Sequence, residues 1–435
     1  MRCLLKAETG RAPRVCIVTP GQIGSNPRVV KEAHALHEAG CDVNVIATRT
    51  LDLVEPRDLA LMRRIPWHLE RLDLRSRLRW RVRRAAQISW RYAFVALARS
   101  ADRGLSAFTP PLRRAALVMP AHLYIAHYPA ALPAVAAAAR RYGAHYAYDA
   151  EDFHLGDWPD DPAYAIERRL VRAIEGRYLP GSAYVTAASP DIADAYAETY
   201  RIARPQVVLN TFPLRHAAPG PTPRGLAVPR PSLYWFSQTI GPDRGLECAV
   251  RAAGLARTRP HLYLRGTPAA GYAERLLDFA RMADAEGRVH LLPPDEPDRM
   301  EELAAAYDAG LCGEPAFTQN NAIALSNKLF TYLLAGIPPL MSDTPAHCRF
   351  AVEAGLTDLL YPREDAAALA DLLDRLFFGD AERLAALRAQ TWRLGQERYN
   401  WEREKNALID SIRRATALLE KNCFTHRWRS CPRPS

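Results

Sequence analysis

The chain has 435 residues, of which 49% are hydrophobic and 24% charged, and this composition is typical of a soluble globular protein with ample core. The length favours two domains. Its eight cysteines form no C-x-x-C pair, which argues against a disulfide frame and a zinc site. No run approaches the roughly 20 apolar residues of a membrane span, and MRCLLKAETGRAPR lacks the apolar stretch of a signal peptide, so we expect a cytoplasmic protein.

Short apolar runs alternate with helical patterns through residues 13–212. RVCIVTP predicts a buried strand, and Asn26 before Pro27 predicts a helix start, because Asn caps helices and Pro fits their first position. Gly40 ends this helix, and DVNVIAT predicts the next strand. Alternation continues from LYIAHY to QVVLNTF. The pattern predicts a parallel, doubly wound sheet.

A basic segment interrupts this alternation and holds most of the net charge of +10. Between Arg63 and Arg91 ten arginines stand against two acidic residues, with Trp and Leu side chains among them. Such a mixture suits an anionic membrane surface, although a solvated surface helix pair explains it as well. Nucleic-acid binding is not expected, because no recognised module accompanies the segment. We interpret 60–104 as an insertion and 62–91 as a candidate contact with the inner face of the cell membrane.

The second half repeats the organisation of the first. The Pro- and Gly-rich residues 213–231 predict a linker, and alternation resumes over 232–380. Helices are expected over 381–421, returning toward the first domain, with a flexible N-terminus over 1–12 and a basic tail over 422–435. The predicted fold is two Rossmann-like α/β domains facing a central cleft, with ligands at the carboxyl ends of the strands.

Two positive side chains in the second half predict a phosphate site. In SNKLFTYLLAG, Ser326 is a candidate N-cap, and Asn327 and Lys328 fall in the first helical turn. A Lys there opposes the helix dipole unless an anion binds nearby, although a surface Lys that reaches water is the alternative. In FSQTIGPDRGLE, Arg244 precedes the helix that opens at Gly245 and projects toward the same crevice. Two cations from separate crossovers suit a diphosphate.

The first half offers a glycine loop and an acidic cluster. Gly21 and Gly24 do not have the G-x-G-x-x-G spacing, which counts against a nicotinamide or flavin enzyme; the loop is either a ligand contact or a plain turn. In YDAEDFHLGDW, Asp149, Glu151, Asp152 and His154 follow a strand end, as expected for hydroxyl recognition or acid–base chemistry. A helix cap with solvated acids is the alternative. Because no strict Asp-x-Asp occurs, a metal-held donor phosphate is not expected.

A set of motifs in fixed order resembles a known family. GSNPRVVKEAHALHEAGCDVNVIA, YDAEDFH, VVLNTFP, SQTIGPDRGLECAVRAA and NKLFTYLLAGIPPLMSD are similar to group 1 (family 4-like) glycosyltransferases of the GT-B fold, over about residues 13–420. The resemblance implies a nucleotide-sugar donor on the C-terminal half and a glycan or lipid-linked acceptor on the N-terminal half. It also implies retention at the anomeric carbon without metal or cofactor, in surface polysaccharide or glycolipid synthesis.

The resemblance also assigns residues. The implied catalytic set is Arg244, Lys328, Glu151, Asp152 and His154. The implied donor-binding residues are Ser237, Gln238, Gly245, Gly266, Ser326, Asn327 and Thr331, and those of the acceptor loop are Gly24, Ser25, Asn26, Arg28 and His127. Asn210 matches a strand-end Asn of the hinge region.

The chain departs from the family pattern at several positions. Two Glu separated by seven residues are common in group 1 enzymes, but Ile323 and Thr331 stand at these positions, and Glu314 has the wrong spacing. A Thr hydroxyl can bind a ribose more weakly than a carboxylate does. Ser237-Gln238 replaces a Gly-Arg, which removes one phosphate cation, and Glu151 replaces a common His. Three functions therefore stay open: an active transferase, a degenerate member that binds a glycan or partner without turnover, and another enzyme such as a sugar-nucleotide epimerase.

Overall fold

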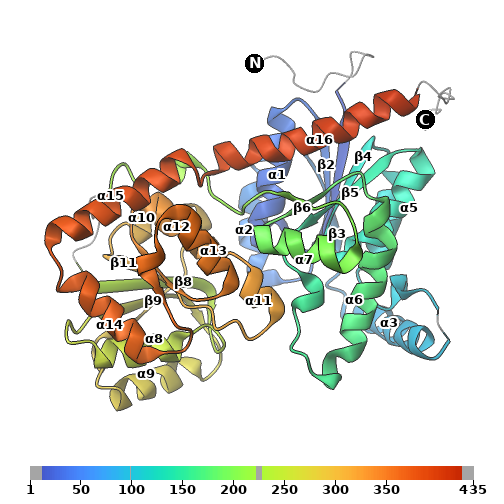
Figure 1. Cartoon of the computed structure of the whole chain (residues 1–435). Coiled ribbons are helices and arrows are strands. Elements are labelled where there is room, and N and C mark those ends of the chain that lie inside the picture. The colour runs from blue at the N-terminus through green and yellow to red at the C-terminus, as the bar shows by residue number, and fades with distance from the viewer. Residues whose placement is uncertain (1–11, 98, 222–227, 424–435) are drawn as a thin grey trace. The chain divides into compact units, whose positions relative to one another are not determined.

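The computed structural model describes residues 12–97, 99–221 and 228–423 (Figure 1). The described chain divides into two compact units, and each of them is an α/β fold around a parallel sheet. Unit 1 contains residues 12–188, 192–208 and 405–423, and unit 2 contains 189–191 and 209–404. The two doubly wound sheets that the sequence predicts are therefore present. The predicted cleft between the domains stays a prediction.

Unit 1 is built on a parallel sheet with strand order β3-β2-β1-β4-β5-β6-β7 in its described part. Its strands are β1 (Arg14–Val18), β2 (Asp42–Arg49), β3 (His68–Asp73), β4 (Leu123–His127), β5 (His145–Ala150), β6 (Val185–Ala187) and β7 (Gln206–Val207). Its helices are α1 (Pro27–Glu38), α2 (Glu55–Met62), α3 (Arg77–Leu97), α4 (Thr109–Val118), α5 (Leu132–Tyr142), α6 (Ala165–Tyr178) and α7 (Pro190–Tyr200).

Helix α1 starts with the predicted Asn cap and Pro. The Asn26 side chain accepts a hydrogen bond from the backbone N–H of Val29, and Pro27 occupies the first helical position. The central strands β1 and β4 are almost entirely buried, as their apolar runs predict, because helices cover both faces of a parallel sheet. These strands fix where the α1 start and the β4 end lie at the carboxyl edge of the sheet.

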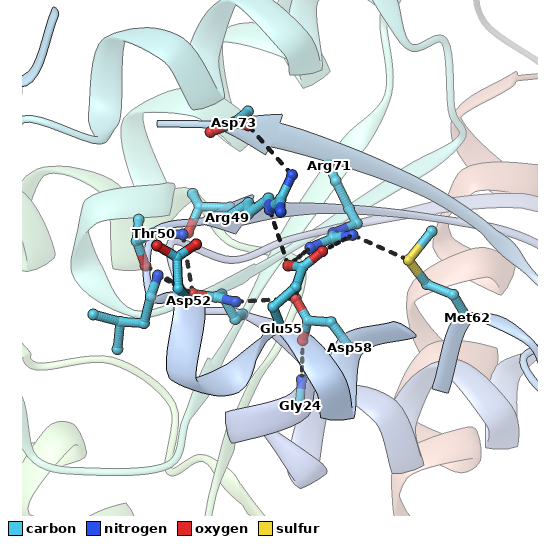
Figure 2. Close-up of polar contacts among 12 residues, drawn as sticks. Gly24, Arg49, Thr50, Asp52, Glu55, Asp58, Met62, Arg71 and Asp73 are labelled. Carbon is cyan, nitrogen blue, oxygen red and sulfur yellow. Dashed lines mark hydrogen bonds and ion pairs between the residues drawn. The ribbon is translucent and has the colours of Figure 1, made fainter. Parts of the chain in front are cut away.

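The basic segment 60–104 differs from the expected insertion, since part of it belongs to the sheet. Strand β3 pairs in parallel with β2, and its exposure alternates only weakly, as expected of an edge strand rich in polar residues. Its Arg71 donates to Glu55 and Asp58 of α2, as Figure 2 shows. The charge pattern of this strand hid its β character from the sequence analysis, because its hydrophobic alternation is incomplete.

Unit 2 has a parallel sheet with strand order β10-β9-β8-β11-β12-β13 in its described part. The strands are β8 (Ser232–Ile240), β9 (His261–Pro268), β10 (Val289–Leu292), β11 (Ala309–Cys312), β12 (Pro339–Ser342) and β13 (Leu360–Tyr361). The helices are α8 (Leu246–Leu255), α9 (Tyr272–Met282), α10 (Met300–Ala304), α11 (Gln319–Ile323), α12 (Asn327–Ala335), α13 (Pro345–Ala354), α14 (Ala366–Phe377) and α15 (Ala381–Glu397).

The C-terminal helices complete the described chain. The predicted helical span 381–421 contains α15 and α16 (Trp401–Cys423), with an interruption after Glu397. Residues up to Glu404 belong to unit 2 and those from Lys405 on to unit 1, so α16 contributes to both. The N-terminal residues 1–11 and most of the predicted basic tail, 424–435, lie outside the described residues. None of the described helices combines the length and the apolar character that crossing a membrane requires.

Candidate active site

A cavity of about 200 Å³ lies in unit 2, among residues that follow the carboxyl ends of β8 and β11. Its lining consists of Trp235, Asp243, Arg244, Glu314, Asn321, Ala324, Ser326 and Lys328. Small-molecule sites commonly enclose about 300–1,000 Å³, so this space suits a diphosphate with part of its substituents. The two cations that the sequence singled out, Arg244 and Lys328, therefore line one cavity.

A tight turn after β8 positions Arg244. Gly245 has φ of 71°, and a Cβ at this position would lie 2.0 Å from the carbonyl oxygen of Gly313. Only glycine permits this conformation and this close packing, so the turn is held against the loop that follows β11. Asp243 also has a positive φ, of 59°. Arg244 itself is exposed and makes no ion pair with any residue that the structure describes.

Lys328 lies at the start of α12 and already has an anionic partner. Ser326 is the N-cap residue, as predicted, but its side chain makes no capping hydrogen bond. Lys328 Nζ lies 2.8 Å from Glu314 Oε1 and 5.7 Å from the centre of the Trp235 ring. The ammonium group is thus held between a carboxylate and an aromatic face, both of which favour its charge.

Glu314 is an ionised carboxylate at the edge of the cavity. Burial alone would raise its pKa, but Lys328 lowers the pKa to about 2. The side chain of Glu314 is only 13% exposed, and His347 Nε2 lies 3.7 Å from Oε2. The cavity therefore holds a fixed negative charge beside one of its two cations.

The other donor-binding predictions lie outside the lining of the cavity. Thr331 is fully buried in α12, and its hydroxyl donates to Glu301 of α10 over 2.9 Å. Gly266 has φ of 153°, and a Cβ there would lie 2.4 Å from the carbonyl oxygen of Ser237, so this glycine serves strand packing. Gln238 and Asn327 are likewise not among the lining residues. The structure thus directs Thr331 toward α10 and not into the cavity.

In unit 1, two predicted acceptor residues are buried in a charge network at the carboxyl ends of β4 and β5. Arg28 donates from Nε and Nη2 to the two carboxylate oxygens of Asp149, over 2.6 and 2.7 Å, and from Nη1 to the carbonyl oxygen of Val208. His127 lies 2.5 Å from Glu32 and 3.3 Å from Asp149. We call Arg28, Glu32, His127 and Asp149 the buried cluster.

The buried cluster corrects the prediction that Arg28 and His127 lie on an acceptor loop. Their side chains are 4% and 1% exposed, so neither presents a free group to a ligand. Burial would raise the pKa of Asp149, but Arg28 and His127 lower this pKa to about 2. Burial likewise opposes the charge of His127, yet Asp149 and Glu32 raise its pKa. This cluster was not apparent in the sequence, because its members come from three separate segments, α1, β4 and β5.

The glycine loop is also committed to internal contacts. The backbone N–H of Gly24 donates to Asp58 Oδ1 over 2.7 Å, a contact that Figure 2 shows. The Ser25 hydroxyl donates to the carbonyl oxygen of Gln22, and Asn26 caps α1. These contacts match the alternative of a plain βα turn.

The acidic cluster does gather at one place in unit 1. His154 Nδ1 lies 2.9 Å from Asp157 Oδ2, and although burial opposes its charge, this partner raises the pKa of His154 to about 9. Burial and the charge of Asp152 raise the pKa of Glu151. Tyr128 packs its ring 5.4 Å from the His154 ring and has φ of 67°, an uncommon conformation for a residue with a side chain. A strained backbone beside perturbed carboxylates is typical of functional loops.

Several residues of the cavity region were not among the predicted site residues, including Trp235, Asn321 and His347. Trp235 reads as core because it lies within an apolar strand, and His347 lies inside the helix α13 without any motif. Asn321 accepts from the backbone N–H of Ala316 and lies in α11, which the sequence analysis did not predict. The position of Glu314 could have indicated that it belongs to the site, since it follows a strand end of the same sheet as Arg244.

A comparison with protein families identifies the N-terminal unit. Residues 24–211 match the model described as a glycosyl transferase 4-like domain. Over these residues the chain is similar to that family of glycosyltransferase domains. Among curated relatives of the chain, D-inositol 3-phosphate glycosyltransferases of Rhodococcus opacus and Nocardia farcinica are 28% and 26% identical over 275 and 276 residues. These matches cover 60% and 61% of this chain but only 58% of each relative.

Solved structures share the fold of this chain. A sucrose-phosphate synthase from Thermosynechococcus elongatus aligns with a TM-score of 0.71 at 14% identity, covering 93% of this chain and 100% of the other. The Anabaena protein HepE, solved with UDP-glucose, aligns with a TM-score of 0.65 at 14% identity over 92% and 99%. At such identities the likeness establishes the GT-B fold alone.

Proposed function

We propose that this protein transfers a sugar from a nucleotide-diphosphate donor to a glycan or lipid-linked acceptor, with retention and without a metal, in surface polysaccharide or glycolipid synthesis. The observation that carries the proposal is the cavity of unit 2, in which the unpaired Arg244 lies with Lys328 at the start of α12. Similar proteins support the proposal, since D-inositol 3-phosphate glycosyltransferases are among the relatives and HepE is solved with UDP-glucose.

The chemistry follows from where charge develops during transfer. As the bond between the sugar and the diphosphate breaks, negative charge grows on the leaving phosphate oxygen. A guanidinium and backbone N–H groups at a helix start stabilise such charge, and one well-placed donor of this kind contributes about 3–4 kcal/mol in known enzymes. We assign this role to Arg244 and to the first turn of α12, whose N-cap side chain leaves the N–H groups uncapped. The Glu151, Asp152 and His154 loop would then serve the acceptor side.

Titration calorimetry with UDP-, GDP-, ADP- and dTDP-sugars tests the donor site. We expect one sugar nucleotide to bind the wild type and binding to weaken about a hundredfold in Arg244→Ala, through loss of a charge-assisted phosphate contact. Arg281→Ala is the matched control, because Arg281 is 60% exposed on α9 and lies outside the cavity lining. Absence of binding by the wild type to all four donors contradicts the proposed function.

Transfer and its stereochemistry need a second experiment. With the donor that binds, nucleoside diphosphate release in the presence of candidate glycan and lipid-linked acceptors measures turnover. The anomeric configuration of the product, read from the proton coupling in nuclear magnetic resonance, then tests retention. An inverted product contradicts the retaining mechanism but leaves the transferase assignment intact.

A membrane contact through α3 is the second part of the proposal. Leu78, Val82, Ile88, Tyr92 and Val95 are exposed, and their spacing places them on one side of the helix. The one residue of α3 that is buried is polar: Gln87, which donates to the carbonyl oxygens of Gly104 and Leu105. The described structure therefore leaves several apolar side chains of this helix exposed, whereas Trp90 and Phe94 are half-buried.

The positive charge of α3 favours a surface of anionic lipid as its partner. Arg77, Arg79, Arg81 and Arg84 of α3 are exposed as well, and the helical spacing places Arg81 among the apolar positions. Apolar side chains interspersed with arginines fit a surface of anionic lipid, where each basic residue contributes about 1 kcal/mol. This location would bring the protein to lipid-linked acceptors.

Sedimentation with vesicles tests the membrane contact. We expect binding to vesicles of phosphatidylglycerol and phosphatidylcholine in equal parts, weaker binding to phosphatidylcholine alone, and loss of binding in the double variant Leu78→Ser, Val82→Ser. Leu255→Ser is the control, because Leu255 is 61% exposed in unit 2. Equal sedimentation of wild type and the double variant contradicts this part of the proposal.

A binding protein without turnover is the competing function. The observation that favours it is the absence of a carboxylate at position 331, where Thr331 is buried against Glu301. Sugar-nucleotide binding without nucleotide release, across all acceptors tested, would support the binder over the enzyme.

A further inference from the structure

The cavity holds a carboxylate that competes for one of its own cations. Glu314 follows β11 by two residues, and its Oε1 lies 2.8 Å from Lys328 Nζ. A phosphate that bonds to the same ammonium group would lie within about 6 Å of Oε1, since each contact spans about 2.8 Å. Any phosphate at Lys328 is therefore close to a second negative charge.

The far side of this carboxylate brings no compensating charge. The Nδ1 of His347 lies 2.8 Å from the carbonyl oxygen of Ser342, which can only accept, so Nδ1 carries the hydrogen. In the neutral imidazole Nε2 is then an acceptor, and it faces Glu314 Oε2 at 3.7 Å. Burial lowers the pKa of His347, although Glu314 acts in the opposite direction, and this keeps the ring neutral. Neither Nε2 nor Oε2 has a hydrogen-bond partner among the described residues.

The charges around the cavity consequently balance. Arg244 and Lys328 are the positive lining residues, and Glu314 and Asp243 are the negative ones. Arg244 and Asp243 are exposed, so solvent screens them, whereas Glu314 and Lys328 are 13% and 14% exposed and interact strongly. The deep part of the cavity thus offers a neutral pair and not a free cation. Such a site attracts a weakly charged diphosphate and opposes every additional negative charge.

Donor and by-product differ in this respect. In a sugar nucleotide both ends of the diphosphate are esterified, so no terminal phosphate titrates near neutral pH. A free nucleoside diphosphate ends in a phosphate whose second pKa is about 6, and at pH 8 it carries about one more negative charge. Glu314 opposes this additional charge more than it opposes the donor.

We propose that Glu314 sets the preference of the cavity for a sugar nucleotide over the free nucleoside diphosphate, and so promotes release of the by-product. This inference rests on the proposed function, because it takes the cavity to be the donor site. Lys328 is in this arrangement shared between the carboxylate and the phosphate. Glu314 acts on specificity through charge and needs no direct bond to the ligand.

The test compares two ligands on two proteins at pH 8 and low ionic strength. Calorimetry measures the Kd of each pair of UDP and UDP-glucose, GDP and GDP-mannose, ADP and ADP-glucose, and dTDP and dTDP-glucose. For the pair that binds, we expect Glu314→Gln to tighten the free diphosphate about tenfold more than the sugar nucleotide, as one unit charge at this range implies. Product inhibition should increase in parallel.

Two variants and one condition separate this role from a structural one. Glu314→Asp keeps the charge and should keep the wild-type ratio of the two Kd values. Glu353→Gln removes a charge from α13, where Glu353 pairs with Arg398 outside the cavity lining, and should leave the ratio unchanged. In the wild type, lowering the pH from 8 to about 5 should reduce the preference for the sugar nucleotide, because the terminal phosphate of the free diphosphate then takes up a proton and loses its additional charge; this readout needs no variant that must fold.

The outcomes are distinct. An unchanged ratio in Glu314→Gln, or a ratio in the wild type that stays the same between pH 8 and about 5, overturns the proposal while the proposed function stands. Weaker binding of the sugar nucleotide alone would place Glu314 on the sugar hydroxyls and also overturns it. If the wild type binds no member of the four pairs, the donor site itself is contradicted.

Discussion

Arg28 and Arg244 occupy the same topological position in the two units, yet they have opposite environments. Each follows the first strand of its parallel sheet, β1 or β8, close to the start of the next helix. Arg28 is buried and donates all its described bonds to Asp149 and to the Val208 carbonyl oxygen. Arg244 is exposed beside a cavity and has no described ion pair. The same residue type at the same place thus stabilises one unit and leaves a charge for a ligand in the other.

The difference shows that the partners available at a strand end decide whether an arginine there stabilises the fold or can bind a ligand. In unit 1, β5 supplies Asp149 from two strands away from β1, so the charge of Arg28 is satisfied inside the protein. In unit 2 the neighbouring strand β11 ends before Glu314, whose partner is Lys328. Arg244 is left without a carboxylate partner among the described residues. Four variants break or sharpen this comparison, and the expected loss of stability falls from the first to the last.

Arg28→Ala should have the largest effect on stability. It leaves the Asp149 carboxylate buried beside a truncated side chain, and breaking a buried ion pair costs about 3–5 kcal/mol. Urea denaturation gives the loss in the free energy of unfolding, and hydrogen exchange should assign it to unit 1. A loss below about 1 kcal/mol would mean that Asp149 finds other partners and that the buried cluster is not structural.

His154→Gln should show a smaller, pH-dependent effect. The pKa of His154 is raised from 6.5 to about 9 in the folded protein, with burial opposing the shift and Asp157 causing it. Protonated His154 therefore stabilises the fold fully below about pH 6.5, and this contribution is lost as the pH rises through about 9. The loss in the variant should be on the order of 2–3 kcal/mol at pH 6 and should vanish above pH 9. Melting curves between pH 5.5 and about 9.5 check this; parallel pH profiles of both proteins would contradict the ion pair.

Lys328→Met should destabilise unit 2 only moderately. It removes the partner of Glu314, but this carboxylate borders the cavity and can recruit water, so we expect a loss of about 1–2 kcal/mol. Sugar-nucleotide binding should be lost at the same time. Lys405→Met is a suitable control, because Lys405 forms an exposed pair with Glu38 at 3.1 Å. A loss as large as that of Arg28→Ala would place Lys328 among the structural charges.

Arg244→Ala should leave stability within about 0.5 kcal/mol of the wild type, since its side chain is exposed and has no described ion pair. Its effect should appear only in ligand binding. Thermal shift with and without the sugar nucleotide measures both quantities in one experiment, because a ligand that binds the native state raises the melting temperature. A variant that melts early without ligand would remove the contrast with Arg28.

Most of the architecture could be predicted from the sequence. The alternation of strands and helices predicts both parallel sheets, and Asn26 with Pro27 predicts the start of α1, because capping depends on adjacent residues. The edge strand β3 was missed, since its charged residues interrupt the alternation. The helix α12 starts after Ser326, as predicted, because a helix start depends on adjacent residues.

The candidate site was predictable in part for the same reason. In a parallel sheet the carboxyl ends of neighbouring strands lie together, so the sequence already indicates that Arg244 and Lys328 lie near one place. Which charges are free is not a local property. Arg28 looks like a loop cation, and Thr331 like a ligand contact, until Asp149 and Glu301 arrive from distant segments.

The sequence by itself therefore determined the two folds, the helix starts and the edge of each sheet at which charges gather, because these depend on periodicity and on neighbouring residues. Only the tertiary structure decided that Arg28 is closed off by Asp149, that Lys328 is paired with Glu314, and that Arg244 has no ion pair in the part of the chain that the structure describes. The physical reason is that a charge is neutralised by whatever lies within a few ångströms of it, and residues far apart in the chain supply these partners.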